Sequence, residues 1–462
     1  MRYLHSYIII LLTTLLLSSC LVGGKFSKPT VTQTPESYPR FEGSIDSISA
    51  IKWFELYQDT VLQRFIRITL DSNRNLLIAG ARVEESREIA GIVKANLYPS
   101  FGYQLSAGGG SAGNEALKVG GGIEGGAVKA YGTLNWEIDI WGKIRHANMA
   151  AYSQFIGDIE NRNGLIVSLV SEVAQLYFLL RDLDNRLMIA QRTLVARKES
   201  TRIITERFNK GYVAEVDKLQ AEQQEALAAV AIPNFQRQII TVENALRVLM
   251  GTSPGTVLRG QTLYEQTVTP NIPPGLPSQL LERRPDIREA ERRLEAQFNY
   301  IGVAKANLYP SLSLTGLLGF ASPQFTTFLG AGGFVANGFA ALTGPVFEFG
   351  KNKRRIRVEE YRTKQAAYQY EQVVLNAFAD VDNALAEYRT YNQEHEIRRL
   401  QVIAARKALE LTRAKYDYGY SSYYEVLIQE NYLFDAELAE STTLQQKINA
   451  LVFLYKSLGG GW

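Results

Sequence analysis

The side chains that could carry out catalysis or hold a metal are few and far apart in this sequence. There is one cysteine, Cys20, and there are three histidines, His5, His146 and His395. A disulfide framework or a cysteine zinc site needs more cysteines, and a histidine cluster needs closer spacing. The segment EHEIRR around His395 lacks the second histidine of a zinc protease, and GKNKR at 350–354 lacks the upstream glycine of a phosphate-binding loop. We therefore expect no catalytic residues and no metal site, and we do not expect an enzyme.

The chemistry that suits Cys20 is acylation. A basic residue near the start precedes an apolar stretch, Tyr7 to Leu17, and residues 17–20 read Leu-Ser-Ser-Cys. A leucine and two small residues before a cysteine at this depth are typical of a bacterial lipoprotein signal, and a plain signal peptide is the alternative. We expect residues 1–19 to be a signal peptide and Cys20 to begin the mature chain. We expect no cofactor apart from a covalent lipid on Cys20.

Composition and charge exclude several classes of protein. The chain has 462 residues, of which 46% are hydrophobic and 21% are charged, with 50 Lys and Arg against 47 Asp and Glu. This is an ordinary globular composition, and a net charge of +3 gives no basic footprint for binding nucleic acid. After the signal peptide, we find no run of 18 uncharged apolar residues, so we expect no transmembrane helix.

The sequence contains a long internal duplication. KANLYPS occurs at 94–100 and again, letter for letter, at 305–311, and the match extends upstream from both copies. Six of the fourteen prolines lie between the two halves, which indicates a non-helical connector. We expect the following organisation: a lipidated extension at 20–50, repeat 1 at 51–250, a proline-rich connector at 251–285, repeat 2 at 286–458 and a glycine-rich terminus at 459–462.

Each repeat has the same predicted order: a helix, a β-hairpin, a long helix and a return helix. The first helix of each repeat should stop at a Tyr-Pro pair, because the residue before proline disfavours helical backbone. The long helices are expected at Lys143 to Asn209 and Lys351 to Tyr418, and the second of these has no glycine or proline. At 1.5 Å per residue each is on the order of 100 Å long. Gly211 and Gly419 should end them.

The predicted strands alternate apolar and polar residues, most clearly in TLNWEIDI at 133–140. We expect turns at the glycine-rich runs 108–126 and 330–338 and a last strand at 341–349. Alternation of this kind is typical of transmembrane barrels, whose smallest members have about eight strands. A soluble sheet covered by aromatic residues is the alternative, and the lipoprotein signal favours the barrel. Because lipid tolerates no open sheet edge, copies of the chain must pool their strands. We therefore predict an α+β membrane protein, a homotrimer with a barrel of about twelve strands, four per chain, from which the long helices project as a tube.

Several segments together resemble the TolC family of outer membrane efflux proteins, in particular the lipidated branch that serves tripartite pumps of the resistance-nodulation-division (RND) type. The most specific are LLERRPDI at 280–287 and LYKSLGGGW at 454–462, supported by residues 53–76 and the two ANLYPS copies. The resemblance covers nearly the whole mature chain. It implies a homotrimer in contact with outer membrane lipid, whose β-barrel is continued by a long periplasmic α-helical barrel. It also implies a periplasmic adaptor protein and an inner-membrane RND transporter as partners, and a location in the outer membrane.

The resemblance also assigns roles to residues at the far ends of the long helices. In the family these helix turns form the periplasmic tip, which touches the adaptor and closes the tunnel. The implied site residues are the turns Gly211 and Gly419, the gate residues Tyr416, Glu425 and Asp217, and the candidate adaptor contacts Arg207 and Lys415. Part of the gate pattern of the member that gives the family its name is missing, because Ser421 stands where that member has an arginine and Ile428 where it has a second acid.

Acidic residues at such a tip suggest a preference for cations. Carboxylates repeated by symmetry around a narrow pore concentrate negative potential there. The alternative is that Asp217 and Glu425 are acids in the first turns of return helices, where they suit the helix dipole. Similarly, Arg207 and Lys415 lie near helix C-termini, where cations are favourable without any partner protein.

The residues and the resemblance together predict the exit duct of a tripartite RND-type pump, which conducts small molecules passively from the periplasm to the exterior. One alternative is a channel for type I protein secretion driven by an ABC exporter. Another is a lipid-anchored coiled-coil scaffold of the envelope, although such a scaffold would need neither the hairpins nor the duplication. The sequence leaves open the exported substrates and the number of pumps that share the channel.

Overall fold

The structure, a computed structural model of the chain, describes residues 21–28, 52–108, 127–266, 281–322, 328–330 and 333–460. The expected signal peptide and Cys20 lie outside the described residues. The chain forms two units, which we describe one at a time. Unit 1 comprises Met1–Thr30, Arg82–Ile159 and Glu289–Glu371, and unit 2 comprises Val31–Ala81, Glu160–Arg288 and Gln372–Trp462.

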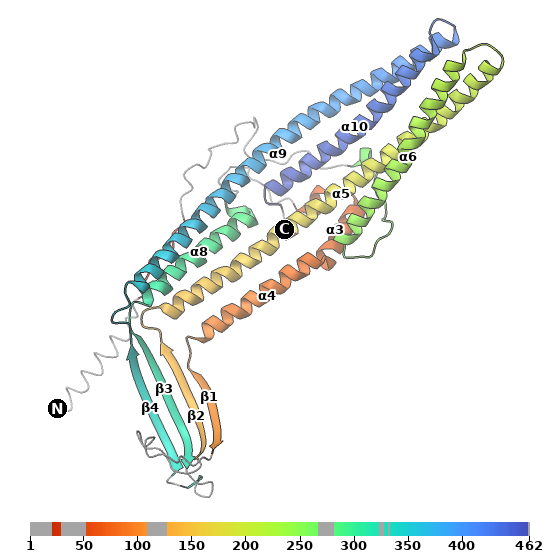
Figure 1. Cartoon of the computed structure of the whole chain (residues 1–462). Helices are drawn as coiled ribbons and strands as arrows, with labels where there is room; N and C mark the ends of the chain where they lie inside the picture. Colours follow the sequence, from red (N-terminus) through yellow and green to blue (C-terminus); the bar gives the residue numbers. More distant parts are fainter. Residues whose placement is uncertain are drawn as a thin grey trace. The chain divides into compact units, whose positions relative to one another are not determined.

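The described elements follow the same order in the two halves of the chain (Figure 1). The first half has the short helices α2 (Trp53–Leu56) and α3 (Thr60–Ser72), then α4 (Arg74–Ala95), β1 (Ser100–Gly108), β2 (Ala127–Ile138), α5 (Lys143–Asn209) and α6 (Glu215–Leu249). A 3₁₀ turn, η2 (Leu263–Glu265), precedes the second half. The second half has α8 (Pro285–Ala306), β3 (Ser311–Ser322), β4 (Phe334–Thr343), α9 (Lys351–Asp417) and α10 (Tyr423–Ser457). Both long helices, α5 and α9, have 67 residues.

Unit 1 contains one antiparallel sheet in the order β1-β2-β3-β4. The last strand differs from the expectation of 341–349, because β4 spans Phe334–Thr343 and Gly338 lies within it, paired with Gly316. Proline cannot donate a ladder hydrogen bond, so Pro345 is better tolerated in the irregular segment that follows the strand. The predicted turn at 108–126 lies almost wholly outside the described residues.

The N-terminal segment 21–28 packs against the strand-to-helix junctions of unit 1. The Val22 amide donates to the Trp141 carbonyl at 3.1 Å, and the Trp141 ring stacks on Tyr309 with centroids 4.7 Å apart. Further along, Phe26 contacts Phe298, with ring centroids 5.7 Å apart. The residues that directly follow Cys20 are therefore held beside an aromatic pair at the end of the sheet.

The core of unit 2 is built from α3, α5, α6 and the C-terminal part of α10. Its fully buried members include Leu62, Phe178, Leu183 and Leu246. Burial of each large apolar side chain contributes about 1.5–3 kcal/mol. One stretch of α5 is apolar and long enough to cross a membrane when up to two charged residues are allowed, which does not contradict the expected absence of an uncharged run of 18 residues. We assign it to the core of unit 2, because 56% of the stretch is buried.

A buried carboxylate joins three segments of unit 2. Asp59 caps α3 by accepting from the Val61 amide at 2.8 Å. It also accepts from the Tyr177 hydroxyl at 2.6 Å, from the Gln261 amide at 3.0 Å and from the Gln266 side chain at 2.9 Å. Burial raises the pKa of Asp59, but these hydrogen bonds outweigh burial and the net shift is downward. Asp59 therefore connects α3, α5 and the segment before the second half of the chain.

Candidate functional site

The two faces of the sheet differ in chemistry. Residues paired across neighbouring strands lie on the same face, so the register assigns every side chain to a face. One face carries almost only apolar residues, among them Phe101, Tyr103, Leu105, Ala130, Leu134, Trp136, Leu312, Leu314, Leu318, Phe320, Phe334 and Leu342. The other face is mostly polar, with Ser100, Gln104, Ser106, Lys129, Thr133, Asn135, Glu137, Ser311, Ser313, Thr315, Asn337 and Thr343. This is the arrangement of a membrane barrel with lipid outside and water inside.

The sheet has two edges, β1 and β4. In the described part of a single chain, neither strand has a partner on its outer side. On β1, Phe101, Tyr103 and Leu105 are all exposed. An apolar strand with an open edge is unstable in lipid and prone to pair with another copy.

Both predicted tip turns have the expected backbone. Gly211 follows α5 with φ 76°, and Gly419 follows α9 with φ 79°. Each turn is closed in the same way: the amide after the glycine donates to a carbonyl five residues back, Tyr212 to Arg207 at 2.9 Å and Tyr420 to Lys415 at 2.8 Å. These are left-handed helix stops that favour glycine. Gly211 and Gly419, which are 208 residues apart, thus form the same turn in the two halves of the chain.

Tyr416 lies in a small cluster at the tip. The Arg207 guanidinium lies over its ring at 5.1 Å, and the Tyr423 ring packs against it with centroids 5.6 Å apart. Tyr423 is buried with Ile204, and burial raises the pKa of its hydroxyl, which stays protonated at neutral pH. The end of α5 is therefore tied to the end of α9 by a cation–π contact.

Glu425 is exposed in the single chain and has two serine partners. The Ser421 hydroxyl donates to its carboxylate at 2.7 Å, and the Ser422 hydroxyl lies 3.4 Å from the other carboxylate oxygen. Ser422 is the N-cap of α10 and accepts from the Glu425 amide at 3.4 Å. Ser-x-x-Glu is a helix-capping pattern, so the bond between Ser422 and the Glu425 amide could have been predicted from the sequence. Ser421 lies outside that pattern and supplies the shortest of these bonds.

The remaining tip residues occupy simpler surroundings. Asp217 is half-buried in the first turn of α6, where it shares the acidic start of the helix with Glu215. The N-cap of α6 is Ala214, which makes no side-chain cap, so this turn lacks the serine pair of α10. Lys415 is exposed in the last turn of α9. The structure thus brings Arg207 and Tyr416 together and leaves Lys415 on the surface.

A set of charged residues between α5, α9 and α10 was not predicted from the sequence. Glu430 and Glu437 of α10 are buried, and they form ion pairs with Arg413 and Arg406 of α9. A signal was available, because two glutamates seven residues apart lie on the same face of a helix and interrupt its apolar stripe. Among the residues that the structure describes, no three metal-binding side chains come together.

Comparison with known proteins decides the family. The family model described as outer membrane efflux protein matches residues 65–252 and 276–460, which is most of the chain. The chain belongs to the outer membrane efflux protein family. The two matched ranges correspond to the two halves of the duplication.

Individual relatives agree with this assignment. The chain is 30% identical over 419 residues to the solvent efflux pump outer membrane protein SrpC of Pseudomonas putida, covering 88% of this chain and 87% of SrpC. It is 28% identical over 461 residues to the probable outer membrane lipoprotein SilC of Salmonella typhimurium, covering 97% of each. The solved open state of the MtrE outer membrane channel of Neisseria gonorrhoeae superposes with a TM-score of 0.87 at 28% identity, covering 96% of this chain and 98% of MtrE.

These findings confirm the predicted family, fold class, general function and location. This efflux protein has the fold of an outer membrane channel, in which barrel strands continue into long helices, and it is an exit duct of an efflux system in the outer membrane. It is one component of a system with several components. The domain boundaries and the roles of the tip residues stay predictions.

Proposed function

We propose that three copies of this efflux protein form one passive duct of a tripartite pump, with a periplasmic adaptor and an inner-membrane RND transporter as partners. The observation that carries the proposal is the two-faced sheet of four strands with two open edges. Three such sheets supply about twelve strands, enough to close a barrel with a polar lumen. The proposed duct conducts small molecules without a catalytic step.

We also propose that Cys20 carries a lipid. The residues that follow it support this, because Val22 is bound to the Trp141 carbonyl and Leu21 lies against Gly142. The described segment after Cys20 is thus bound next to the stacked Trp141 and Tyr309 rings, and paired aromatics are typical of the membrane interface. Replacing Cys20 by serine should abolish incorporation of labelled palmitate while the protein still folds. Equal labelling of the variant and the wild type would contradict the proposal.

We further propose that the tip turns of unit 2 form a gate and an adaptor-binding surface. Glu425 and Asp217 are its acidic gate residues, and Tyr416 with Arg207 is the aromatic contact that holds α5 and α9 together. The proposed adaptor surface includes Lys415 and three exposed tyrosines beside the two turns, Tyr212, Tyr418 and Tyr420. Exposed aromatic side chains of this kind are enriched in protein interfaces.

The experiment that tests the proposed pump is an affinity pull-down of the tagged chain from crosslinked envelopes of its own host, read by mass spectrometry. We expect a periplasmic adaptor and an RND transporter to co-purify. A matched control carries Tyr212, Tyr418 and Tyr420 each changed to serine, which should reduce recovery of the adaptor without loss of the channel from the membrane. Recovery of an ABC exporter in place of the RND transporter would reassign the duct to protein secretion.

A further inference from the structure

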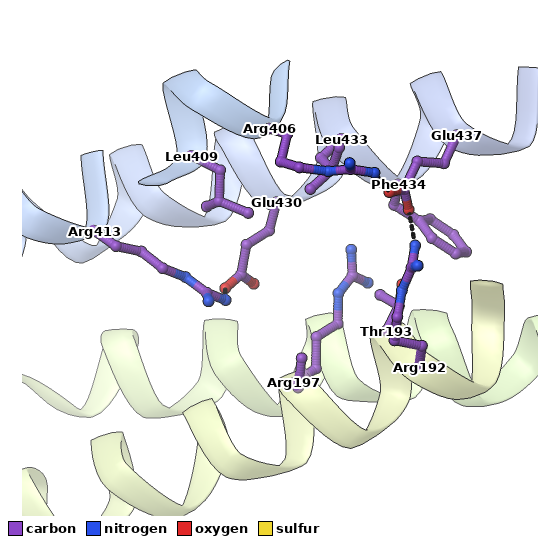
Figure 2. A pocket seen from close by; sticks show the side chains of 11 residues that line it. Arg192, Thr193, Arg197, Arg406, Leu409, Arg413, Glu430, Leu433, Phe434 and Glu437 are labelled. Carbon is purple, nitrogen blue, oxygen red and sulfur yellow. Dashed lines mark hydrogen bonds and ion pairs between the residues drawn. The ribbon is translucent and has the colours of Figure 1, made fainter. Parts of the chain in front are cut away.

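A groove of about 390 Å³ in unit 2 lies between α5 on one side and α9 and α10 on the other (Figure 2). Four arginines line it, Arg192, Arg197, Arg406 and Arg413, together with two glutamates, Glu430 and Glu437. Four guanidinium groups against two carboxylates leave an excess of two positive charges in one small space. Nothing in the proposed transport function uses this groove.

The two carboxylates form ion pairs with three of the arginines. Glu437 accepts from Arg192 and also from Arg406, the latter at 2.9 Å. Glu430 accepts from Arg413 at 2.5 Å. These three arginines are partly exposed at the rim of the groove. The fourth guanidinium, that of Arg197, forms no ion pair or hydrogen bond with either groove carboxylate, although the charge of Glu430 acts on it.

Arg197 is the unusual member of the set, because only 3% of it is exposed. Its two terminal nitrogens donate to neutral oxygens, the Gln224 carbonyl at 2.7 Å and the Asn431 side chain at 2.8 Å. Its Nε is buried with no hydrogen-bond partner, and its guanidinium lies 5.3 Å from the Phe434 ring. Burial lowers the pKa of Arg197. The charges of Glu430 and Asp435 act against this shift but do not cancel it, so the desolvation cost of the buried cation is only partly offset. A bound anion would offset more of it.

The apolar residues that line the groove indicate which class of ligand would fit it. Leu409, Leu433 and Phe434 give the groove an apolar wall beside the guanidinium groups. A volume of about 390 Å³ is within the range of small-molecule sites, roughly 300–1,000 Å³. An inorganic anion would use the charges and leave the apolar wall unused. An anionic group on an apolar ring would use both.

We propose that this groove binds a small organic anion, a carboxylate or sulfonate carried on an aromatic body. The anionic group would accept from Arg197 and from the rim arginines, and the ring would pack against Phe434 and Leu433. Such a ligand would contact α5, α9 and α10 at once and would hold these helices together. The inference does not depend on which pump the duct serves.

The test is isothermal titration of 1-naphthalenesulfonate into the full mature protein in detergent, with heats of titration into the same detergent buffer subtracted. We expect saturable binding of one molecule per chain. Arg197→Gln should weaken it about 10-fold or more, because the charge-assisted hydrogen bonds are lost. The control Arg202→Gln removes a charge from the same helix, where Arg202 pairs with Glu199 and Glu206 outside the groove, and should leave binding unchanged.

A second variant keeps the test decisive if Arg197→Gln does not fold. Thr193→Glu introduces a carboxylate among the lining residues, which should occupy the arginines and abolish binding while every arginine is kept. The neutral analogue 1-naphthalenemethanol should give no saturable heat. The proposal is wrong if Thr193→Glu binds the sulfonate like the wild type, or if the neutral analogue binds equally well.

Discussion

The Glu425 carboxylate accepts from two serine hydroxyls, which are neutral and leave its charge uncompensated. If Glu425 lines the constriction of the trimer, Glu425→Gln should lower the cation-to-anion permeability ratio. In the trimer this variant removes three charges. Each charge about 4 Å from the ion in water-like surroundings contributes about 1 kcal/mol, or roughly a fivefold effect per charge. The ratio is measured from reversal potentials in planar bilayers under a salt gradient.

The control for this measurement is Glu410→Gln, because Glu410 is an exposed acid of α9 that is already paired with Lys407 at 2.7 Å. It should leave the ratio unchanged. An unaltered ratio in Glu425→Gln would support the simpler interpretation, in which Glu425 only completes the capping pattern of α10.

Asp59 gives a prediction about stability and pH at the same scale. The pKa of Asp59 is lowered in the folded protein. The carboxylate therefore stabilises the fold at pH values above its ordinary pKa of about 4. This contribution is lost as the pH falls through the lowered pKa of the folded protein. Asp59→Asn should cost about 1–3 kcal/mol at pH 7, because an amide cannot accept from all of its donors. Thermal unfolding followed by circular dichroism at pH 7 and pH 3 measures both effects.

For Asp59→Asn, the loss of stability relative to the wild type should shrink at pH 3. The matched control is Asp71→Asn in α3, an exposed acid, which should unfold like the wild type at pH 7. A wild-type protein and an Asp59→Asn variant with the same midpoint at pH 7 would show that the buried network is not stabilising.

At the scale of the elements, two glycines of the sheet allow the observed register of β2 and β3 to be tested. A Cβ on Gly319 of β3 would lie 2.2 Å from the Ala130 carbonyl oxygen of β2, whereas a Cβ on Gly338 of β4 would meet nothing within 4 Å. Gly319→Ala should therefore cost about 1–3 kcal/mol through forced backbone shifts, and Gly338→Ala about 0.5 kcal/mol or less. The urea midpoint of the folded protein in detergent measures the difference. Equal midpoints would mean that the β2–β3 pairing is wrong.

The whole molecule should be a closed ring of three chains. Within one chain β1 and β4 are separated by two strands, about 14 Å, so a crosslinker of roughly 8 Å can join Gln104→Cys and Asn337→Cys only between chains. With Cys20 replaced by serine, this double variant should give a covalent ladder on denaturing gels that ends at three chains. Each single variant should stay monomeric on the gel. A ladder that continues beyond three chains would exclude the closed trimer.

Local features of the sequence determined much of the architecture. The bounds of α5 and the start of α9 matched the predicted helices, and the tip glycines Gly211 and Gly419 adopt the predicted left-handed backbone. These features depend on neighbouring residues only: an absence of breakers within the helix and a glycine at its end. The duplication and the family resemblance could also be recognised from the sequence, in the KANLYPS copies and the terminal segment, because comparing sequences requires no knowledge of contacts.

The tertiary structure alone decided which distant residues meet. The last strand lies at Phe334–Thr343 rather than at 341–349, because its register is set by pairing with β3 and not by its own alternation. The groove around Arg197 takes side chains from α5, α9 and α10. Arg197 of α5 donates there to Asn431 of α10, which is 234 residues further along the chain. Helical periodicity gives the face of a side chain but not the helix that faces it. The charge excess in the groove follows only from that packing.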